Sequence, residues 1–351
     1  MDFKPYLEMM VAKKASDVFI SAGSPVQIKI DGKLHRIGET NYTPALCREA
    51  VYSLLNEPQI SALEREREID VGIGLEGRGR FRINAFHQCG SLAMVIRYLP
   101  AEIPSVDELG LPEVLKGIVM QRRGIVLMVG ATGSGKSTTL AAMIDHRNSN
   151  SRGHILTIED PVEYVHPHKG CIVNQRELGM DTLSYAAALE SSLREAPDVI
   201  LIGEIRNRET MEAAIELSGT GHLAISTLHA NNAHQAMERV INLFPQVMHK
   251  TLLMDLSLNL RAIIAQRLVR TVDDKRTAAV EILINTPHIS DLIREGQIDE
   301  ISEAMAGSSE GGMVTFDDAL LGLYRQGRIS LDECLAHADS AANLEARINF
   351  G

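Results

Sequence analysis

The sequence predicts an α/β fold in which a parallel sheet covered by helices follows a smaller α+β domain. Short apolar runs alternate with longer helical patterns between residues 125 and 228, which is typical of a parallel sheet with helical crossovers. A segment with three prolines, residues 100–112, separates this region from the first hundred residues. At 351 residues the chain is long enough for two hydrophobic cores. We therefore expect a first domain over residues 1–99, a linker over 100–112 and a second domain over 113–351.

The first domain is expected to mix strands and helices. Asp31-Gly32 is a favoured tight-turn pair between two strand-like runs, so it predicts a hairpin. Arg80 and Arg82 alternate with apolar residues, which places both arginines on one face of a strand. The expected helices cover residues 3–14, 45–55 and 58–68, and the expected strands cover residues 17–21, 26–30, 33–37, 81–86 and 92–98.

The second domain is expected to begin with the parallel sheet and to end in helices. Its predicted strands cover residues 125–129, 155–158, 199–202 and 223–227. From Pro245 onward the patterns are mostly helical.

Composition excludes several classes of protein. The formal net charge is -11 and Trp is absent, whereas nucleic-acid binders usually carry a basic face or aromatic platforms, so we expect no nucleic-acid partner. No apolar run approaches the roughly 20 residues that cross a bilayer, and the N-terminus lacks the basic start of a signal peptide. The four cysteines stand far apart without a CxxC pair, which indicates reduced thiols. These observations favour the cytoplasm.

Residues 130–137, GATGSGKS, satisfy the phosphate-binding pattern G-x-x-x-x-G-K-[ST]. An apolar run leads into the pattern and a helix-forming run follows it, as the pattern requires. Glycines allow the backbone N–H groups to converge, and the helix N-terminus adds a favourable dipole. Lys136 is expected to neutralise the β- and γ-phosphates of a nucleotide, and the Ser137 hydroxyl to hold Mg²⁺. The predicted nucleotide-binding residues are Gly130, Ala131, Thr132, Gly133, Ser134, Gly135, Lys136, Ser137 and Thr138.

Two groups of acidic residues follow predicted strands. Glu204 follows the strand over 199–202 at the end that faces the ligand crevice of a parallel sheet, so we expect it to bind Mg²⁺, directly or through water. Asp198, at the other end of that strand, is expected to be a surface or capping residue. Pro161 holds the second group in an extended turn, where Glu159 or Glu163 would activate the attacking water. The alternative for this second group is a solvated acidic loop.

His222 and His229 bracket the predicted strand over 223–227. A single histidine is more often a structural hydrogen-bonding group, but a pair around a strand of this sheet favours a nucleotide-sensing role. No cysteine or third histidine stands at ligand spacing, so we expect no zinc site.

The sequence resembles the secretion ATPase superfamily, and within it the PilT/PilU group of type IV pilus retraction ATPases. Four motifs carry the resemblance in the family's order: GATGSGKS, TIEDPVEYVH, DVILIGEIRNRET and GHLAISTLHANNA. The earlier segments ASDVFISAG and GRFRINAF are similar to the N-terminal domain of that group. The resemblance implies a RecA-like P-loop NTPase core, a PAS-like N-terminal domain, and ATP and Mg²⁺ as ligands.

The resemblance also implies roles for individual residues. It assigns water activation to Glu163, Mg²⁺ coordination to Glu204 and the two positions of the family's histidine motif to His222 and His229. In the family, arginines of the N-terminal domain reach the γ-phosphate, and such arginines change the rates of P-loop enzymes by about 10³–10⁵. The corresponding residues here are Arg80, Arg82 and Arg97, which without the resemblance would be interpreted as solvated surface.

The departures from the family pattern favour one branch. Residues 287–295, PHISDLIRE, keep only the second half of the AIRNLIRE segment of PilT-type motors, and this is more similar to the accessory PilU branch. We also expect neither the four-cysteine zinc module nor the long N-terminal extension that is typical of assembly ATPases, which weakens the assembly interpretation.

The resemblance therefore implies a hexameric ATP-hydrolysing motor for pilus retraction and twitching motility. The implied partners are further copies of the chain, an inner-membrane platform protein and a related retraction ATPase, at the cytoplasmic face of the inner membrane. The alternatives are a pilus assembly or type II secretion ATPase, and a weakly hydrolysing structural subunit of a mixed motor.

Overall fold

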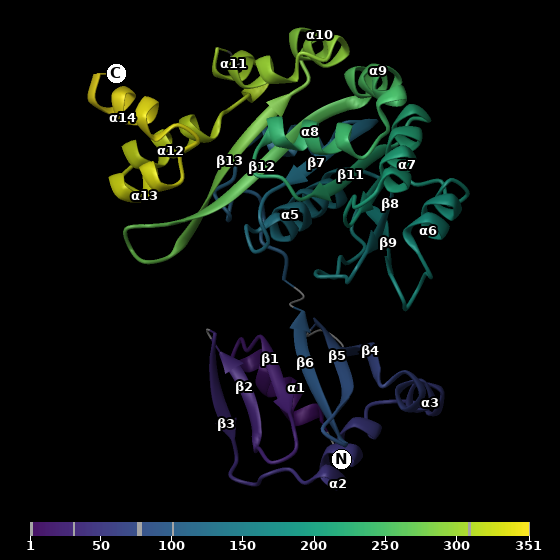
Figure 1. Cartoon of the computed structure of the whole chain (residues 1–351). Helices are drawn as coiled ribbons and strands as arrows, with labels where there is room; N and C mark the ends of the chain where they lie inside the picture. The colour runs from purple at the N-terminus through teal and green to yellow at the C-terminus, as the bar shows by residue number, and fades with distance from the viewer. Residues whose placement is uncertain (1–2, 31, 76–78, 100–101, 308–309, 351) are drawn as a thin grey trace. The chain divides into compact units, whose positions relative to one another are not determined.

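The computed structural model describes residues 3–30, 32–75, 79–99, 102–307 and 310–350, which fold into two compact units (Figure 1). The first unit comprises residues 1–102 with 163–165, and the second comprises residues 103–162 with 166–351. The first two residues of the expected linker, 100 and 101, lie outside the described residues. Val106 and Leu111, from its later part, are buried in a core of the second unit.

The first unit is built on a six-stranded antiparallel sheet in the order β3-β2-β1-β6-β5-β4. Three helices accompany the sheet, and α2 packs on β6. Val18, Ile83 and Ile96 are among the residues of its buried core. The elements are α1 (Lys4–Ala12), β1 (Asp17–Ile20), β2 (Val26–Ile30), β3 (Lys33–Ile37), α2 (Pro44–Tyr52), α3 (Glu57–Glu66), β4 (Glu68–Leu75), β5 (Gly79–Gln88) and β6 (Ser91–Leu99).

The predicted elements of the first unit are confirmed, with ends that differ by a few residues. The hairpin of β2 and β3 forms around Gly32, whose φ of 77° is the left-handed conformation that glycine adopts readily. Asp31, the other turn residue, lies outside the described residues. Strand β5 alternates as predicted, because Phe81 and Ile83 are buried whereas Arg80 and Arg82 face the other side.

Strand β4 was not predicted, because its glycines weaken the strand pattern. Gly72 pairs with Arg82 across the ladder, and a Cβ at Gly72 would lie 2.5 Å from a guanidinium nitrogen of Arg80. The glycine therefore provides the space in which the Arg80 side chain crosses β4.

The second unit is built on a seven-stranded sheet in the order β13-β12-β7-β11-β10-β8-β9, in which only the β12–β13 pair is antiparallel. The strands are β7 (Gly124–Val129), β8 (Gly153–Glu159), β9 (Cys171–Glu177), β10 (Val199–Ile202), β11 (Leu223–Leu228), β12 (Leu260–Arg270) and β13 (Arg276–Ile284). The predicted α/β class with a parallel-sheet core is thus confirmed.

The expectation of mostly helical structure after Pro245 is wrong for residues 260–270 and 276–284, which form β12 and β13. The run LRAIIAQRLVR contains good helix formers, and its apolar residues do not alternate as in an exposed strand. Pairing with β7 on one side and β13 on the other determines the strand conformation, and both faces of β12 are largely buried.

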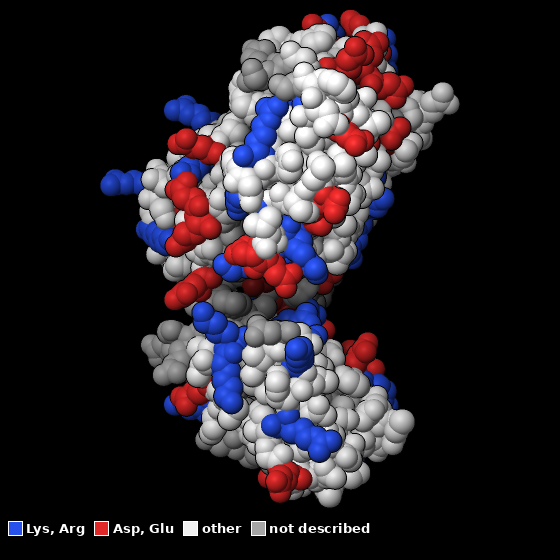
Figure 2. Space-filling model, turned by 90° about the vertical axis from the view of Figure 1, so that its left-hand side faces the viewer, with Lys and Arg blue, Asp and Glu red and all other residues white. Residues whose placement is uncertain are grey.

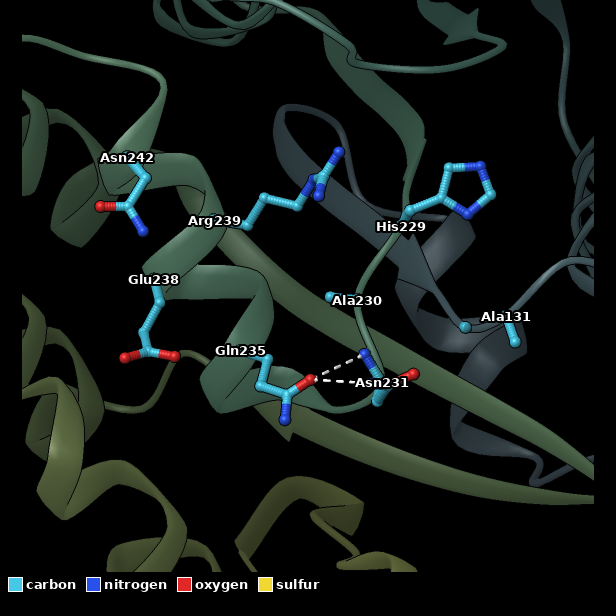
Figure 3. Close-up of a pocket in the computed structure, with 9 residues that line it drawn as sticks. Ala131, His229, Ala230, Asn231, Gln235, Glu238, Arg239 and Asn242 are labelled. Atoms are coloured by element: carbon cyan, nitrogen blue, oxygen red, sulfur yellow. Dashed lines mark hydrogen bonds between the residues drawn. The ribbon is translucent and has the colours of Figure 1, made fainter.

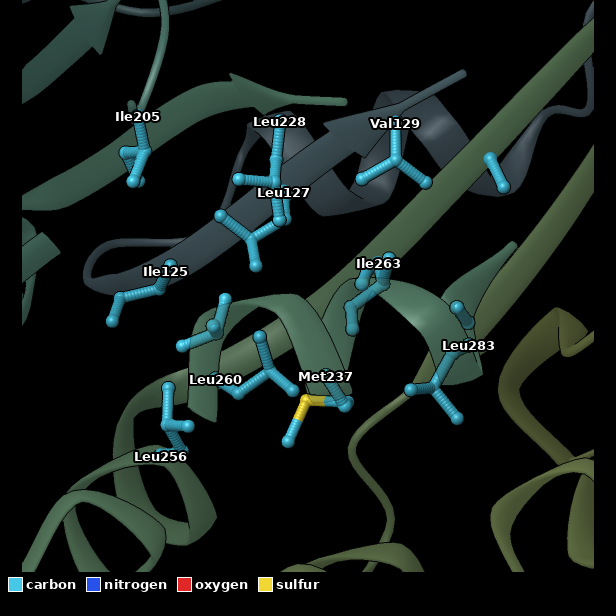
Figure 4. Close-up of a cluster of buried hydrophobic side chains, with 14 of the residues drawn as sticks. Ile125, Leu127, Val129, Ile205, Leu228, Met237, Leu256, Leu260, Ile263 and Leu283 are labelled. Carbon is cyan, nitrogen blue, oxygen red and sulfur yellow. The ribbon is translucent and has the colours of Figure 1, made fainter. Parts of the chain in front are cut away.

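Helices cover both faces of this sheet (Figure 1). Side chains of β7 alternate between two cores: Ile125, Leu127 and Val129 pack with α7, α8 and α9 (Figure 4), whereas Val126 and Met128 pack with α4 and α5. The helices are α4 (Val114–Val119), α5 (Lys136–Asn150), α6 (Tyr185–Ser192), α7 (Arg208–Gly219), α8 (Ala233–Asn242), α9 (His249–Asn259), α10 (Pro287–Glu295), α11 (Ile301–Ala306), α12 (Phe316–Arg325), α13 (Leu331–Ala336) and α14 (Ala341–Phe350), with short 3₁₀ turns at Gln246–Met248, Ile298–Glu300 and Glu310–Gly312. Among the described helices, none is both long and apolar enough to cross a membrane.

Glu281 of β13 is a buried carboxyl group between two helix starts. It accepts a hydrogen bond of 2.7 Å from the backbone N–H of Ala233 in α8 and another from Phe316 in α12. Burial raises the pKa of Glu281 to about 7, although both hydrogen bonds and the nearby Arg267 oppose the shift. The carboxyl group is therefore protonated in the folded chain at pH values where it ionises in the unfolded chain.

This difference predicts a pH-dependent stability. The pKa of Glu281 in the folded chain lies above its ordinary value of 4.5. The contribution of Glu281 to the free energy of unfolding is therefore fully present below pH 4.5 and is lost as pH rises to about 7. Over this pH range the free energy of unfolding falls by about 3 kcal/mol. Glu281→Gln keeps a neutral side chain at all pH values, so we expect similar stability to wild type at pH 5 and greater stability at pH 8. Urea denaturation at the two pH values measures this, and an unchanged pH dependence in the variant would contradict the assignment.

Candidate nucleotide site

The order of the strands brings four predicted site segments to one edge of the second unit's sheet. Strands β7, β11, β10 and β8 are neighbours and run parallel, so their carboxyl ends lie at the same edge. The GATGSGKS loop follows β7, His229 follows β11, Glu204 follows β10, and Glu159 ends β8.

The GATGSGKS loop leads directly into α5, which begins at Lys136. Gly133 and Gly135 have φ values of 80° and 88°, which a residue with a side chain rarely adopts. The Lys136 ammonium donates to the carbonyl oxygens of Gly130 at 2.7 Å and Ala131 at 2.9 Å, so it lies across the loop. Ser137 follows in the first turn of the helix, where backbone N–H groups favour an anion.

Gln266 of β12 supports this loop and was not predicted from the sequence. Its buried amide donates to the Ser134 carbonyl at 2.8 Å and accepts from the Thr139 hydroxyl at 2.7 Å. A Cβ at Gly130 would lie 2.5 Å from the backbone carbonyl oxygen of Gln266, and a Cβ at Gly135 would lie 2.7 Å from the side-chain amide nitrogen of Gln266. Because Gln266 is more than 120 residues from the loop in sequence, no local pattern indicates this contact.

The neighbouring residue, Arg267, contacts the C-terminal helices. Its guanidinium donates to the His337 carbonyl at 2.6 Å and pairs with Asp339 at 2.6 Å. It also stacks over the ring of Phe316, 3.9 Å from the centroid. Adjacent residues of β12 therefore bond to the phosphate loop and to the C-terminal region.

Glu204 lies in a small charged cluster. Its carboxylate accepts from Arg206 Nε at 2.7 Å and lies 3.2 Å from His229 Nε2, with 16% of the side chain exposed. Arg206 also approaches Asp160, with 3.8 Å between Nη1 and the carboxylate. The cluster places the two predicted residues Glu204 and His229 in direct contact.

Gly203 determines the course of the chain just before Glu204. A Cβ there would lie 2.8 Å from the Tyr185 hydroxyl and 3.2 Å from the backbone of Glu159. Burial, reinforced by Asp160, raises the pKa of Tyr185 to about 12, so the phenol remains protonated beside these acids. A larger residue at position 203 would require the Tyr185 side chain or the backbone at the end of β8 to shift.

His222 does not join this cluster. It precedes β11, and its backbone carbonyl accepts from Gly124 at the start of β7, so it lies at the opposite edge of the sheet from His229. Its ring Nδ1 lies 3.1 Å from both the Leu217 carbonyl and the Thr220 hydroxyl. In this unit, His222 makes the contacts of a structural hydrogen-bonding residue. Asp198, at the same edge, accepts from the His154 N–H at 2.8 Å, as expected of a capping residue.

The two candidate water-activating carboxylates have different surroundings. Glu159 accepts from the Thr157 hydroxyl at 2.6 Å and from the Gln175 amide at 3.3 Å. Glu163 follows Pro161 and is exposed. Local hydrogen bonds therefore occupy Glu159, and the two residues remain alternatives for activating water.

A pocket of about 540 Å³ lies beside the start of the phosphate loop (Figure 3). Arg239 extends into it from α8 toward the segment that carries His229, and Asn231 bonds to Gln235 at the base of the helix. The sequence did not single out Arg239, because α8 is an ordinary amphipathic helix with this residue on its polar face. The lining residues are Gly130, Ala131, His229, Ala230, Asn231, Gln235, Glu238, Arg239 and Asn242.

In the first unit, two of the predicted arginines lie opposite each other on neighbouring strands. Arg82 of β5 pairs in register with Arg97 of β6. Arg82 bonds to Asp70 at 2.9 and 3.2 Å, and Arg97 bonds to Asp17 at 2.9 Å. On the face visible in Figure 2, basic side chains predominate on this unit, whereas both signs are interspersed on the second unit.

A family model described as "Type II/IV secretion system protein" matches residues 2–333. The chain belongs to the type II/IV secretion system protein family.

Members of the type II/IV secretion system protein family with curated descriptions extend this finding. The chain is 51% identical over its whole length to the type IV pilus ATPase PilU of Pseudomonas aeruginosa, of which it covers 92%. It is 40% identical to the type IV pilus retraction ATPase PilT of the same organism, over 98% of this chain and 100% of that protein. The crystal structure of the pilus retraction motor PilT with bound ADP matches with a TM-score of 0.91 and 39% identity, over 98% of this chain and 99% of that one. The resemblance drawn from the four motifs is thus confirmed.

Proposed function

We propose that this protein is an ATP-hydrolysing motor that powers the retraction of type IV pili. One observation carries the proposal: a complete phosphate loop shares a sheet edge with Glu204 and His229, in a chain that matches a retraction motor over nearly its whole length. The ADP in that motor's crystal structure supports a nucleotide as the ligand of the loop.

Several residues, most of them in the second unit, divide the work of hydrolysis among them. Lys136 and the loop N–H groups bind the phosphates, and Ser137 and Glu204 would hold Mg²⁺. The fit is supported by their chemistry, because hydroxyl and carboxylate oxygens are the ligands that Mg²⁺ prefers. Bound Mg²⁺ would neutralise charge on the phosphates. Glu163 or Glu159 orients the attacking water.

The arginines of the first unit, Arg80, Arg82 and Arg97, bind the γ-phosphate in this proposal. When hydrolysis removes the γ-phosphate, the arginines lose the negative charge that they bind, and the first unit then moves relative to the second. A ring of six copies would convert this motion into work on a platform protein of the inner membrane, at its cytoplasmic face.

A deletion strain and an ATPase assay test the proposal together. We expect the purified chain to hydrolyse ATP in the presence of Mg²⁺, and the deletion strain to retain surface pili but to lose twitching. A strain that lacks surface pili would instead indicate an assembly ATPase. Nucleotide binding without turnover by the assembled ring would indicate a structural subunit.

A second candidate is an accessory role beside another retraction ATPase. It is favoured by the identity to PilU, 51%, over that to PilT, 40%. Expression in a strain that lacks both retraction ATPases distinguishes the two. Restored twitching by this chain alone indicates an independent motor, and restoration only together with the second ATPase indicates an accessory one.

A further inference from the structure

A row of four charged residues crosses one face of the first unit's sheet. Asp17 of β1 lies opposite Arg97 of β6, and Arg97 lies opposite Arg82 of β5. Asp70 of β4 completes the row diagonally from Arg82 and forms a two-point ion pair with it. The row therefore reads acid, base, base, acid across four adjacent strands.

The two arginines at the centre carry like charges on directly opposed residues, which destabilises a sheet unless the charges are compensated. Each arginine meets a carboxylate on its outer side: Arg97 Nε donates to Asp17 at 2.9 Å, and Arg82 Nε and Nη2 donate to Asp70 at 3.2 and 2.9 Å. These bonds engage the Nε side of both guanidinium groups. In the described part of the chain, no hydrogen bond involves the Arg97 Nη atoms or Arg82 Nη1, and both arginines line a cavity of about 280 Å³.

Asp17 is much the more buried of the two carboxylates. Asp17 keeps only 5% of its side chain exposed, and burying an ionised carboxylate is unfavourable unless it is paired. Apolar residues in place of a buried ion pair often leave stability unchanged or improve it, so pairing alone is weak evidence for a stabilising role. Asp70 is itself oriented, because Asn84 donates to it at 3.2 Å from within the same cavity lining. Both carboxylates are thus held where they fix the direction of an arginine.

We propose that Asp17 and Asp70 are positioning residues that hold Arg97 and Arg82 with their free N–H groups directed toward a terminal phosphoryl group. The inference rests on the proposed function, in which these arginines bind the γ-phosphate. The carboxylates themselves do not touch the nucleotide. They fix two guanidinium planes before the ligand arrives, and this reduces the side-chain entropy lost on binding.

The test compares Asp70→Asn and Asp17→Asn with Arg82→Ala and Arg97→Ala in the full-length protein. The readouts are kcat, KM and the ratio of the dissociation constants for ADP and for AMP-PNP, a non-hydrolysable ATP analogue. Only AMP-PNP carries a third phosphate, so this ratio reports the γ-phosphate contact and is insensitive to a general loss of structure. A misplacement of about 1 Å can cost about 10²-fold in rate. We expect Asp70→Asn to lower kcat by about ten- to a hundredfold and to reduce the ratio, with ADP affinity unchanged.

Glu64→Gln is the matched control. Glu64 belongs to the same unit, is exposed to nearly the same extent as Asp70 (39% against 40%), and accepts from Tyr52 at 2.6 Å outside the row. We expect it to leave the ratio and kcat at the wild-type values. Asp70→Glu retains the charge and is expected to recover part of the loss.

The outcomes separate the inference from the proposed function. If Arg82→Ala and Arg97→Ala reduce the ratio while both aspartate variants match wild type, the positioning role is wrong and the proposed function stands. If the arginine variants also match wild type, the γ-phosphate contact fails and the inference fails with it. If Asp70→Asn lowers the melting temperature and reduces the affinities for ADP and for AMP-PNP equally, Asp70 has a structural role only. Asp70 lies at the surface, so the test remains decisive even if the buried Asp17→Asn variant does not fold.

Discussion

Arg82→Ala is expected to lower kcat for ATP hydrolysis by about 10³–10⁵, the range found for arginines that stabilise charge in phosphoryl transfer. The side chain lies on the face of β5 opposite the core, so its removal leaves Phe81 and Ile83 packed. The affinity for ADP should remain near wild type, because ADP lacks the γ-phosphate. Steady-state ATPase assays, with ADP binding followed by calorimetry, measure both quantities.

Arg65→Ala provides the control for Arg82→Ala. Arg65 belongs to the same unit and forms an exposed pair with Glu66 at 2.6 Å, and such surface pairs contribute little to stability. The variant should retain wild-type turnover. Wild-type turnover in Arg82→Ala as well would show that Arg82 is a solvated surface residue and would remove the arginine contact from the mechanism.

Lys136→Ala is expected to lower kcat/KM by about 10²–10³ or more, because it removes a cationic donor from the site where negative charge develops. The ammonium already lies at the loop, 2.7 Å from the Gly130 carbonyl and 2.9 Å from that of Ala131. Unlike Arg82→Ala, this change should also lower the affinity for ADP, since lysine at this position contacts the β-phosphate. Titrations with ADP and AMP-PNP, combined with turnover, distinguish the two variants.

Lys169→Ala is the corresponding control for Lys136→Ala. Lys169 lies in the same unit and pairs with Asp145 at 2.7 Å, away from the phosphate loop. Its loss should leave nucleotide affinity unchanged. If Lys136→Ala binds and hydrolyses ATP like wild type, the nucleotide does not bind at the GATGSGKS loop and the motor hypothesis fails.

Local patterns predicted the parts of the fold in which neighbouring residues determine the structure. The runs around Ile125 and Val199 are fully apolar because both faces of their strands are buried, and each was assigned correctly. The hairpin around Gly32 followed from its turn residues. The phosphate loop followed from its glycine spacing, and its context of strand and helix is present.

The missed elements depend on partners far away in the sequence. Strand β12 gains its conformation from pairing with β7, whose residues precede it by more than 130 positions. Gln266 acquires its role only when that pairing sets it against Ser134. Likewise, Asp17 meets Arg97 across 80 residues, so the row of charges on the first unit has no local signature. His222 and His229, in contrast, are close in sequence but lie at opposite ends of β11, so their proximity in sequence does not bring them together.

The direct succession of Gln266 and Arg267 has a thermodynamic consequence. Gln266 bonds to the phosphate loop, and Arg267 bonds to the C-terminal region. A shift of this part of β12 on nucleotide binding would therefore also change the contacts of the C-terminal helices. Where two equilibria share such a link, the coupling is reciprocal. A protein that binds the C-terminal helices and alters nucleotide affinity must itself be bound more or less tightly, by the same factor, when nucleotide is present.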